Sequence, residues 1–563
     1  MLHNMLHNLS IRNKLIVMGA VMSALFLVAL DQTIVSTALA AIVKEFNSFS
    51  SLGFIVTAYM LTTTVTVPLA GKLSDMYGRK PLLLSGVAIF TIGSLLSGAS
   101  PGIEWLIAWR ALQGIGGGII TANAFTIIGD LFPVEERGKW QGMFGAVFGM
   151  SSVIGPLLGG WLTDGANIAG LVTDWRWTFL INVPIGIIAT IALVRYCPKI
   201  KHDAKHKPDY LGAILLTVSL AALILAVDNT ELIFKDIINN GVSLNLIKNI
   251  LFILSALAAL VFVWIEQRAK QPTLPLRFFK NKTYSLIIIV ALLFGAAFLG
   301  SILYLTQFNQ QVFGASASQA GLMLLPMVAG MMVSSLSTGQ IVSRIGSYKW
   351  FITAGYALVS ISMFSLTILQ PNTPYWHEAV IMVFIGLGMG MCLPILSLAV
   401  QNEFTHKDLG AATSSVQLFR GLGSTIGTAI FAGVLTTGII NNIGNANNLP
   451  YIQTLHKSPQ ASKMLDGELN SDKLLQINSQ HKEILAGAEQ GFKNMPTPIR
   501  EQSINQFKSQ QDEYNSKILQ SFSDSLHGIF IISASLMVVG CAITLLLPHK
   551  KLSSSSKASL VAD

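Results

Sequence analysis

Fourteen long apolar runs dominate this chain and limit the folds that it can adopt. About 20 mainly apolar residues cross the hydrocarbon core of a bilayer as a helix, and most of the runs approach that length. Only 12% of the 563 residues are charged, against ~25% in soluble proteins, so a set of soluble cores with polar surfaces is excluded. The sequence therefore predicts an all-α polytopic membrane protein with 14 transmembrane helices. The runs lie at 16–42, 52–71, 82–100, 104–128, 141–163, 177–195, 210–227, 248–265, 284–307, 318–338, 349–369, 379–400, 411–438 and 527–547.

Basic residues gather in one alternate set of loops. If the N-terminus is cytoplasmic, the cytoplasmic loops and tails hold 23 of the 37 Lys and Arg residues, and the short outer loops hold four. The segment 440–526 is left out of this comparison, because long translocated loops escape the positive-inside rule. The bias predicts a multi-pass protein of the cytoplasmic (inner) membrane with both termini in the cytoplasm. It also explains the net charge of +9, so we expect the lipid bilayer and no nucleic acid as a partner.

The cysteines give no sign of redox or metal chemistry. Cys197, Cys392 and Cys541 all lie in or beside apolar runs, so neither a disulfide framework nor a metal site of closely spaced cysteines is predicted. The first apolar run continues to about Ile42. This is too long for a signal peptide, so we interpret it as the first span.

A weak internal repeat divides the chain. Gly71 and Gly78 follow the second run, and Gly339 and Gly346 follow the tenth with the same spacing of seven residues. Internal repeats are typical of secondary transporters, whose site lies between the repeated halves. The predicted organisation is a cytoplasmic N-terminus (1–15), an N-terminal six-helix half (16–195), two inserted helices with flanking loops (196–283), a C-terminal six-helix half (284–547) that contains a long extracytoplasmic loop (440–526), and a cytoplasmic tail (548–563).

Several motifs, in this order, resemble the major facilitator superfamily. GKLSDMYGRK at 71–80 resembles its loop 2–3 signature, RALQGIGGG at 110–118 its span 4 motif, and SSVIGPLLGG at 151–160 the span 5 motif of antiporters. LDQTIV at 30–35 is similar to span 1 of the fourteen-helix drug:proton antiporters. The resemblance covers about 20–440 and resumes near the last span. It implies the major facilitator fold, with two six-helix halves plus two inserted helices.

Asp31 is a carboxylate inside the first span, where charges are costly and tend to be functional. Counting ~1.5 Å per residue places it ~22 Å above the inner membrane edge, and Arg110 in span 4 lies ~21 Å above the same edge. The matched depth makes Asp31 and Arg110 candidates for a buried pair. The resemblance implies that this pair couples transport to protons, whereas a fixed structural ion pair is the alternative.

The loop 2–3 motif predicts a very short inner turn. Asp75 can accept hydrogen bonds from a neighbouring helix N-terminus or from a cation such as Arg79 or Arg137. The resemblance implies a conformational latch that contains these three residues with Gly71 and Gly78, and that breaks when the halves move. An ordinary solvated turn is the alternative.

The span 5 motif leaves one helix nearly bare of side chains, so that it can pack closely or bend at a proline. The resemblance implies that Gly155, Pro156, Gly159 and Gly160 take part in antiport, and simple helix packing is the other interpretation. Met and aromatic side chains adapt to ligands of varied shape. As candidates for the lining of a substrate cavity we expect Tyr59, Tyr304, Phe308, Met327 and Arg420.

The segment 440–526 is polar and unusually long for a loop. Apolar residues from Ile504 to Phe522 recur at helical spacing, which predicts a helix that runs into the last span. An earlier helix is expected near 459–492, with Pro496 and Pro498 separating the two. A helical hairpin over the outer mouth resembles what some members of this family carry, and a disordered loop is the alternative.

The leading functional interpretation is a proton-coupled antiporter, and not an enzyme, that exports amphipathic drugs or toxic compounds across the cytoplasmic membrane by alternating access. Export of one metabolite, such as a siderophore, a fatty acid or an amino acid, is the nearest alternative, and a non-transporting sensor is another. No nucleotide-binding loop is present, so we expect the proton gradient as energy source and no cofactor. The expected partners are small-molecule substrates and protons, with a periplasmic adaptor protein if the source has two membranes. A monomer is expected.

Overall fold

Among the residues that the structure describes, fourteen helices are long and apolar enough to cross a membrane, and one lies at each of the fourteen predicted runs. Parts of the predicted cytoplasmic tails, 1–9 and 553–563, lie outside the described residues, as does part of the helix expected near 459–492. The computed structural model describes residues 10–46, 52–168, 170–198, 208–227, 230–315, 317–405, 407–456, 469, 471–493 and 496–552.

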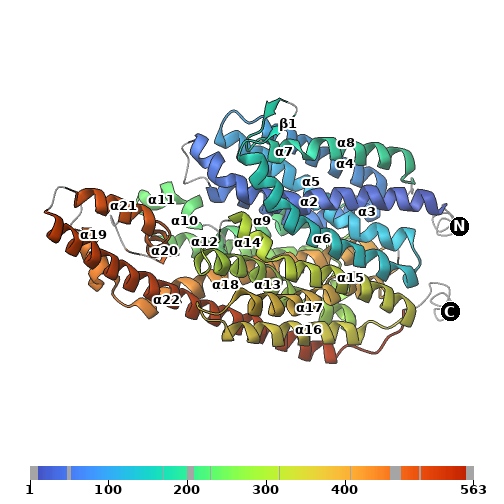
Figure 1. Cartoon of the computed structure of the whole chain (residues 1–563). Coiled ribbons are helices and arrows are strands. Elements are labelled where there is room, and N and C mark those ends of the chain that lie inside the picture. The colour runs from blue at the N-terminus through green and yellow to red at the C-terminus, as the bar shows by residue number, and fades with distance from the viewer. Residues whose placement is uncertain are drawn as a thin grey trace, which may run out of the picture.

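The first six spans form one bundle, coloured blue to teal in Figure 1. Its last span is divided into two helices near Ile181, and a two-stranded antiparallel ribbon precedes it. The elements are α2 (Ile11–Phe46), α3 (Leu52–Tyr77), α4 (Arg79–Gly98), α5 (Ile103–Leu131), α6 (Val134–Thr163), β1 (Asn167–Ile168), β2 (Leu171–Val172), α7 (Trp177–Leu180) and α8 (Asn182–Tyr196).

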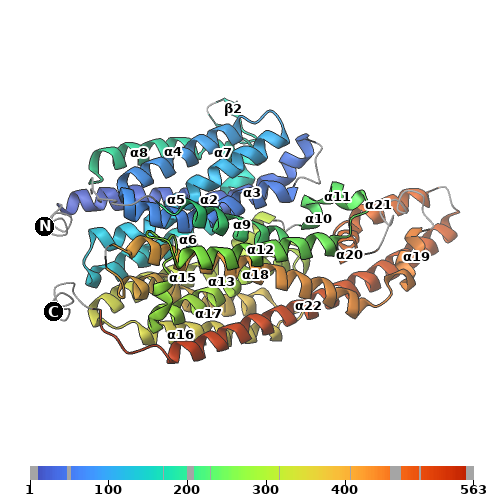
Figure 2. The same ribbon diagram turned by 180° about the vertical axis from the view of Figure 1, so that it is seen from behind.

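The last six spans form the second bundle, which lies beside the first in both views (Figures 1 and 2). Its spans are α13, α15, α16, α17, α18 and α22. The elements from η2 onward are η2 (Leu276–Lys280), α13 (Lys282–Gln311), α14 (Ala317–Met323), α15 (Leu325–Ile345), α16 (Lys349–Ser365), η3 (Leu366–Ile368), α17 (Tyr375–Gln401), α18 (Leu409–Ile443), η4 (Ala446–Asn448), α19 (Pro450–His456), α20 (Ser471–Ser479), α21 (His481–Gly491) and α22 (Thr497–Leu545).

Two further spans stand between the halves in the chain and outside them in space. They are α9 (Tyr210–Val227) and α12 (Leu244–Glu266), joined through α10 (Thr230–Ile233) and α11 (Lys235–Asn239). The two spans pack along each other, where Ser219 Oγ donates to the Ser255 carbonyl at 3.0 Å, and α9 also contacts α3 and α18. The inserted pair therefore touches one helix of each half.

The later glycine of each repeat has a positive φ angle, although the two ψ angles differ. Gly78 between α3 and α4 has φ 95°, and Gly346 at the end of α15 has φ 71°, a region in which a Cβ is strained. Their partners seven residues earlier also match, because Gly71 packs against α18 and Gly339 against α6, each in the opposite half. The equal spacing thus corresponds to two equivalent places in the two halves.

Helix α2 begins and helix α22 ends at the same end of the bundle, which we call the terminal end (Figure 1). At the opposite end, α19 to α22 project beyond the bundle, and we call this the hairpin end. Helix α22 is continuous from Thr497 to Leu545, so it connects the projecting hairpin to the last span without a break. Pro496 is its N-cap residue and follows the end of α21 at Gly491.

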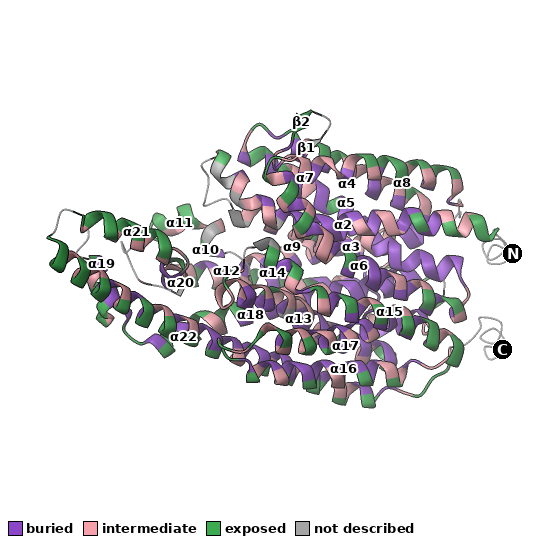
Figure 3. Cartoon of the chain, in the orientation of Figure 1, coloured by how far each residue is buried: buried purple, intermediate pink, exposed green. Residues whose placement is uncertain are grey.

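Exposed apolar side chains cover the outside of the bundle. Figure 3 shows mixed green and pink outer faces around a purple interior. Leu260 on α12 is 67% exposed and Ile361 on α16 is 65% exposed, an arrangement that suits a surface in contact with lipid rather than water.

Candidate functional site

Asp31 lies fully buried in the middle of the N-terminal half, within a cage of donors. Arg110 Nη1 on α5 lies 2.5 Å from Asp31 Oδ2, and Gln113 Nε2, one turn later on α5, donates to Oδ1 at 2.8 Å. Arg110 also donates to Gln113 Oε1 at 2.7 Å. The two residues that were expected at matched depth are therefore in direct contact.

The cage has further walls that the depth argument did not identify. Asn182 Nδ2 at the start of α8 lies 3.5 Å from Asp31 Oδ1 and donates to Ser94 Oγ on α4 at 2.9 Å. The Arg110 guanidinium carbon stands 4.2 Å from the centre of the Tyr59 ring, in cation–π contact. Gln113 was visible in the span 4 motif, whereas Asn182 has no sequence signal that links it to Asp31.

This arrangement makes the charge on Asp31 matter to several helices. Removing a charge from a buried ion pair leaves its partner unpaired in a medium of low dielectric constant. Protonation of Asp31 would remove the negative charge that holds Arg110. A protonated carboxyl oxygen would also donate a hydrogen bond where it now accepts one from Gln113. A proton at this one carboxylate can thus alter how α2, α4, α5 and α8 pack.

A second polar cluster joins the two halves at the terminal end. Asp75 at the end of α3 accepts from the backbone N–H groups of Gly410 and Ala411 at 2.9 and 2.8 Å, so it caps the N-terminus of α18 in the other half. Arg79 Nη2 lies 2.6 Å from Asp75 Oδ1, and Arg79 Nε lies 2.7 Å from Asp130 Oδ2 on α5. Of the two cations considered for Asp75, Arg79 makes the contact.

Arg137 has another role in the structure. Its guanidinium donates to the carbonyls of Gly129 and Phe132 at 2.6 and 3.1 Å, which places a cation at the C-terminal end of α5, where the helix dipole favours it. Sequence analysis did not identify Asp130, because nothing in the loop 2–3 motif refers to the end of span 4.

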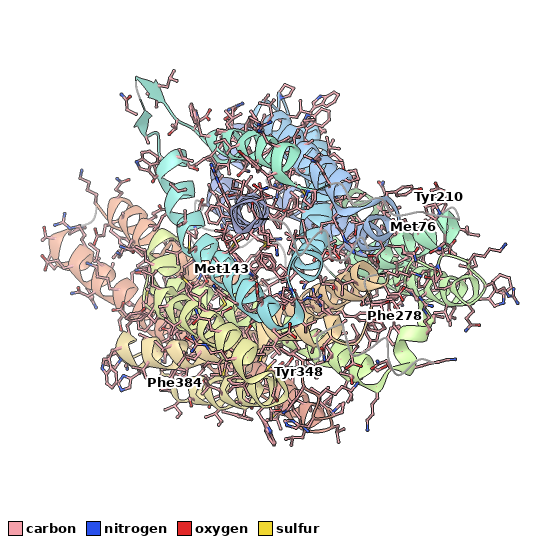
Figure 4. All side chains as sticks on the ribbon, turned by 90° about the vertical axis from the view of Figure 1, so that its right-hand side faces the viewer. Met76, Met143, Tyr210, Phe278, Tyr348 and Phe384 are labelled. Atoms are coloured by element: carbon pink, nitrogen blue, oxygen red, sulfur yellow. The ribbon has the colours of Figure 1, made fainter. Side chains whose placement is uncertain are left out.

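Two further contacts hold the halves together near the same end. Gln141 Nε2 on α6 donates to Gln401 Oε1 on α17 at 2.8 Å, and Gln401 Nε2 donates to the Phe125 carbonyl on α5 at 2.8 Å. Figure 4 looks at the molecule from the terminal end, where α6, marked by Met143, lies against helices of the second half. On α6 and α15, Gly138 and Gly339 approach so closely that a Cβ on either would strike the other's carbonyl.

The span 5 glycines pack α6 against α2. Added methyl groups at Gly155 or Gly159 would collide with side chains and backbone around Thr33 and Ile34, and Thr33 Oγ1 donates to the Ser151 carbonyl at 3.0 Å. The Gly160 carbonyl accepts from Asp164 at the helix end. On its other side, α6 meets α14, where Gly321 lies against the Pro156 ring.

The five residues expected to line a cavity are not gathered in one place. Tyr59 belongs to the core of the first half, and Tyr304, Phe308 and Met327 belong to the core of the second. All four side chains are at most 3% exposed. Only Arg420 reaches across, with its guanidinium carbon 5.7 Å from the Phe148 ring centre on α6.

Metal binding finds no support in the described part of the chain. There, no three His, Cys, Asp or Glu side chains lie close enough together to hold a metal ion. The expectation that no cofactor is needed stays a prediction.

Comparison with known proteins gives the family. The model of the Major Facilitator Superfamily matches residues 21–428. The chain is 34% identical over 543 residues to multidrug transporter protein MdtP of Bacillus subtilis, covering 96% of this chain and 94% of that protein. It is 38% identical over 433 residues to multidrug resistance protein 3 of the same organism, covering 77% of this chain and 81% of that protein.

Solved structures agree on the fold. The proton:xylose symporter XylE superposes with a TM-score of 0.59 at 13% identity, covering 98% of this chain and 99% of that one. The human organic anion transporter MFSD10 gives a TM-score of 0.54 at 16% identity, covering 74% of this chain and 93% of that one. The predicted fold is confirmed, and the relatives are transporters rather than enzymes. This chain is therefore a multi-pass membrane transporter that belongs to the major facilitator superfamily.

Proposed function

We propose that this protein is a proton-coupled antiporter that exports amphipathic drugs or other toxic compounds by alternating access. The observation that carries the proposal is the fully buried carboxylate of Asp31, held by Arg110 and Gln113 at 2.5 and 2.8 Å. An intramembrane acid with one cationic partner is suited to bind and release a proton. The names of the two bacterial relatives, both described as multidrug proteins, support the substrate class.

Coupling would follow from the two states of Asp31. As a carboxylate it ties α5 to α2, and as an acid it no longer holds the Arg110 charge. A proton can drive transport only if it binds the inward-open and outward-open conformations with different affinity. The cage around Asp31 supplies such a difference if movement of the two halves changes the distances within it. Substrate and proton would then bind alternately in the N-terminal half.

The contacts at the terminal end supply the conformational part. Asp75 holds the N-terminus of α18, and Gln141 holds Gln401, so these bonds must break for the halves to separate at this end. We infer that Gly71, Gly78 and Arg79 complete this latch and that the glycines of α6 act as a pivot against α2. Arg137 would support the latch indirectly, by fixing the end of α5 beside Asp130.

We further propose that the terminal end faces the cytoplasm at the inner membrane, as the distribution of basic residues suggests. We also propose that the protein acts as a monomer, and that it works with a periplasmic adaptor protein only if its source is a bacterium with two membranes. Cysteines added one at a time at Ser10 and Thr373, the latter on the connection between η3 and α17, should react with an impermeant thiol reagent from opposite sides of the membrane. Reaction from the same side would contradict this topology.

Proton release from vesicles tests the central proposal. Inverted vesicles acidified inside should lose their pH gradient when a substrate is added, and Asp31→Asn, compared with the wild type at equal protein level, should abolish this response. Glu403→Gln, which alters an acid paired with Lys550 at the terminal end, is the matched control. Uphill efflux at the normal rate by Asp31→Asn would contradict the coupling role.

The same assay separates a drug exporter from a metabolite exporter. Several chemically unrelated amphipathic compounds should each dissipate the gradient if the proposal is right. A response to one siderophore, fatty acid or amino acid alone would favour the metabolite exporter. Growth inhibition in a pump-deficient host should follow the same pattern of compounds.

A further inference from the structure

A second buried acid lies in the C-terminal half, far from the Asp31 cage. Glu378 in the first turn of α17 is 0% exposed, and neither of its carboxyl oxygens has a hydrogen-bond partner among the described residues. Asn309 on α13 lies beside it, near enough for its side chain to interact with the carboxyl group, although the pair lacks hydrogen-bond geometry. The Asn309 side chain is also 0% exposed, and its amide nitrogen and oxygen likewise have no partner in the described part of the chain.

Within the part of the chain that the structure describes, this acid has no cationic partner. The hairpin-end halves of the helices packed around α17, which are α6, α13, α15, α16 and α18, contain no Lys, Arg, His, Asp or Glu. The titratable groups that remain are tyrosines, Tyr304 on α13, Tyr356 on α16 and Tyr375 on α17, together with the half-buried His377 on α17. The Tyr375 hydroxyl is already engaged, because it donates to the Met323 carbonyl at 2.6 Å.

An isolated carboxylate in such surroundings is very unfavourable, whereas the neutral acid is far cheaper to bury. A structural acid at a helix start normally caps backbone N–H groups, and Glu378 makes no such bond. Its place in the first turn also puts it within ~6 Å of the helix end along the axis, next to the exposed Trp376. The route to the aqueous phase at the hairpin end is therefore short.

We propose that Glu378, together with Asn309, forms a second proton-binding site, which exchanges its proton with the compartment at the hairpin end. The Asn309 amide can donate to the ionised form or accept from the neutral one, so one neighbour serves both states. This site is separate from Asp31 and does not require that Asp31 carries protons.

The site is attached to the segment that bridges the halves at this end. The Asn309 carbonyl accepts from Ala315 at 3.2 Å, which turns the chain from α13 toward α14. Tyr375, one turn before Glu378, holds the other end of α14 through Met323. Between these points Gly321 rests on Pro156 of α6. Charging Glu378 would draw in water between α13 and α17 and loosen this support, so proton release would favour separation of α14 from α6.

Infrared titration of the protein reconstituted in lipid tests the proposal directly. At neutral pH the wild type should show a carbonyl band of a protonated carboxylic acid that Glu378→Gln lacks and that Asp31→Asn and Glu403→Gln retain. The band should disappear as the pH is raised. In Asn309→Leu the acid stays but its neighbour changes, so the band should shift in frequency.

Two results would overturn the inference. One is a Glu378→Gln spectrum with the full wild-type acid band, which would mean that Glu378 is ionised. The other is a band that persists to the highest pH at which the protein remains folded, which would mean a permanent structural acid. As a second measurement, amide exchange of the segment containing α14 should rise more steeply with pH in wild type than in Glu378→Gln, and equal profiles would exclude the link to α14. Loss of export in Asp31→Asn with an intact Glu378 band separates this site from the proposed coupling mechanism.

Discussion

The carboxylate of Asp75 accepts a hydrogen bond from the backbone N–H of Gly410, 335 residues later in the chain and in the opposite half of the molecule. With the second bond to Ala411, this acid acts as the N-cap of α18. The residue that precedes α18, Asp408, makes no cap hydrogen bond with its own side chain. The start of one half's helix is thus satisfied by the other half, so helix capping and closure of the terminal end are the same interaction.

Asp75→Asn should weaken this closure without unfolding the protein. Asn keeps only one of the two oxygens that accept from Gly410 and Ala411, and loss of a capping bond costs at most ~2 kcal/mol, which raises amide exchange in the first turn of α18 by up to about 30-fold. Hydrogen exchange measured by mass spectrometry on peptides from 409–415 checks this. In the control Asp408→Asn, which affects only the pair with Arg277 at 2.8 Å, exchange should be unchanged. Equal exchange in the two variants would contradict the capping role.

Arg110→Met should be strongly destabilising, because it leaves Asp31 buried without its cation. Breaking a buried ion pair on one side typically costs ~3–5 kcal/mol, so we expect a clear fall in Tm in detergent. The double variant Asp31→Asn/Arg110→Met removes both charges and should recover most of the stability. Neither variant should support uphill efflux. A single variant as stable as the wild type would show that the pair is not energetically coupled.

The sequence predicts the part of this site that depends on the rise of a single helix, which sets the depth of each residue in the membrane. Helix rise alone gave the depths of Asp31 and Arg110, and in straight spans matched depth brings residues of neighbouring helices together. Depth does not give the direction around the helix axis, which is why Tyr304, Phe308 and Met327 were expected in a cavity and lie in a core. All fourteen spans were predictable, since bilayer thickness and hydropathy set their length.

Contacts between the halves were the least predictable. That an acid in the loop 2–3 turn would meet a helix N-terminus was expected, but which helix depends on how two bundles are rotated against each other. The bond from Gln141 to Gln401 and the bond from Gln401 to the Phe125 carbonyl connect segments more than 250 residues apart, and no local pattern marks them. Glu378 was overlooked because it lies at the end of an apolar run, where an acid is usually solvated.

A surface ion pair at the hairpin end should respond to acid. Arg176 Nη2 lies 2.7 Å from Glu45 Oε1, and the hydrogen bond from Arg176 lowers the pKa of Glu45 from its ordinary value of 4.5. A group with a lowered folded-state pKa stabilises the fold above its ordinary pKa, and this contribution is lost as the pH falls through the lowered value. The loop around Trp175 should therefore stay attached to α2 at neutral pH and loosen only in acid below 4.5.

Trp175 provides the readout, because its indole Nε1 donates to Glu45 Oε2 at 2.6 Å. We expect a tryptophan fluorescence change on acidification that is absent in Glu45→Gln. In Arg176→Gln the midpoint should move up toward the ordinary carboxyl value. A midpoint that is unchanged by Arg176→Gln would mean that Arg176 does not set the titration of Glu45.

The projecting hairpin should be an ordered unit. Phe507, Tyr514, Ile518 and Phe522 on α22 are at most 5% exposed. Helices α19 to α21 pack against α22, and Tyr514, for example, donates to the Leu474 carbonyl at 2.9 Å. Hydrogen exchange across 504–522 should therefore be slow, and complete exchange within seconds would rule the hairpin out.

One glutamine connects the layers of this hairpin. Gln511 Nε2 donates to the Tyr451 hydroxyl at 2.7 Å and to the His481 carbonyl at 2.9 Å. Gln511→Ala leaves both groups unpaired, which costs ~1–3 kcal/mol. Protection should fall in 504–522 and remain in the spans. In Lys508→Ala, which removes only an exposed pair with Glu489, protection should stay as in the wild type.

Deletion of 445–520 with a short flexible linker should leave the fourteen spans folded. The segment carries none of the residues of the Asp31 cage, of the latch or of the α6 glycines. The deletion removes the part of α22 that packs on α19 to α21 and keeps the part that enters the bundle. The faces that α19 to α21 and this part of α22 present to each other are lost together, so the newly exposed apolar surface is confined to the end of α18, which contacts α20 and α22. We expect the protein level to be unchanged, and efflux to fall or the range of exported compounds to shift, since the hairpin stands over the end from which substrates would leave. Drug resistance equal to that of the full chain, at equal protein level, would instead identify the hairpin as a spacer.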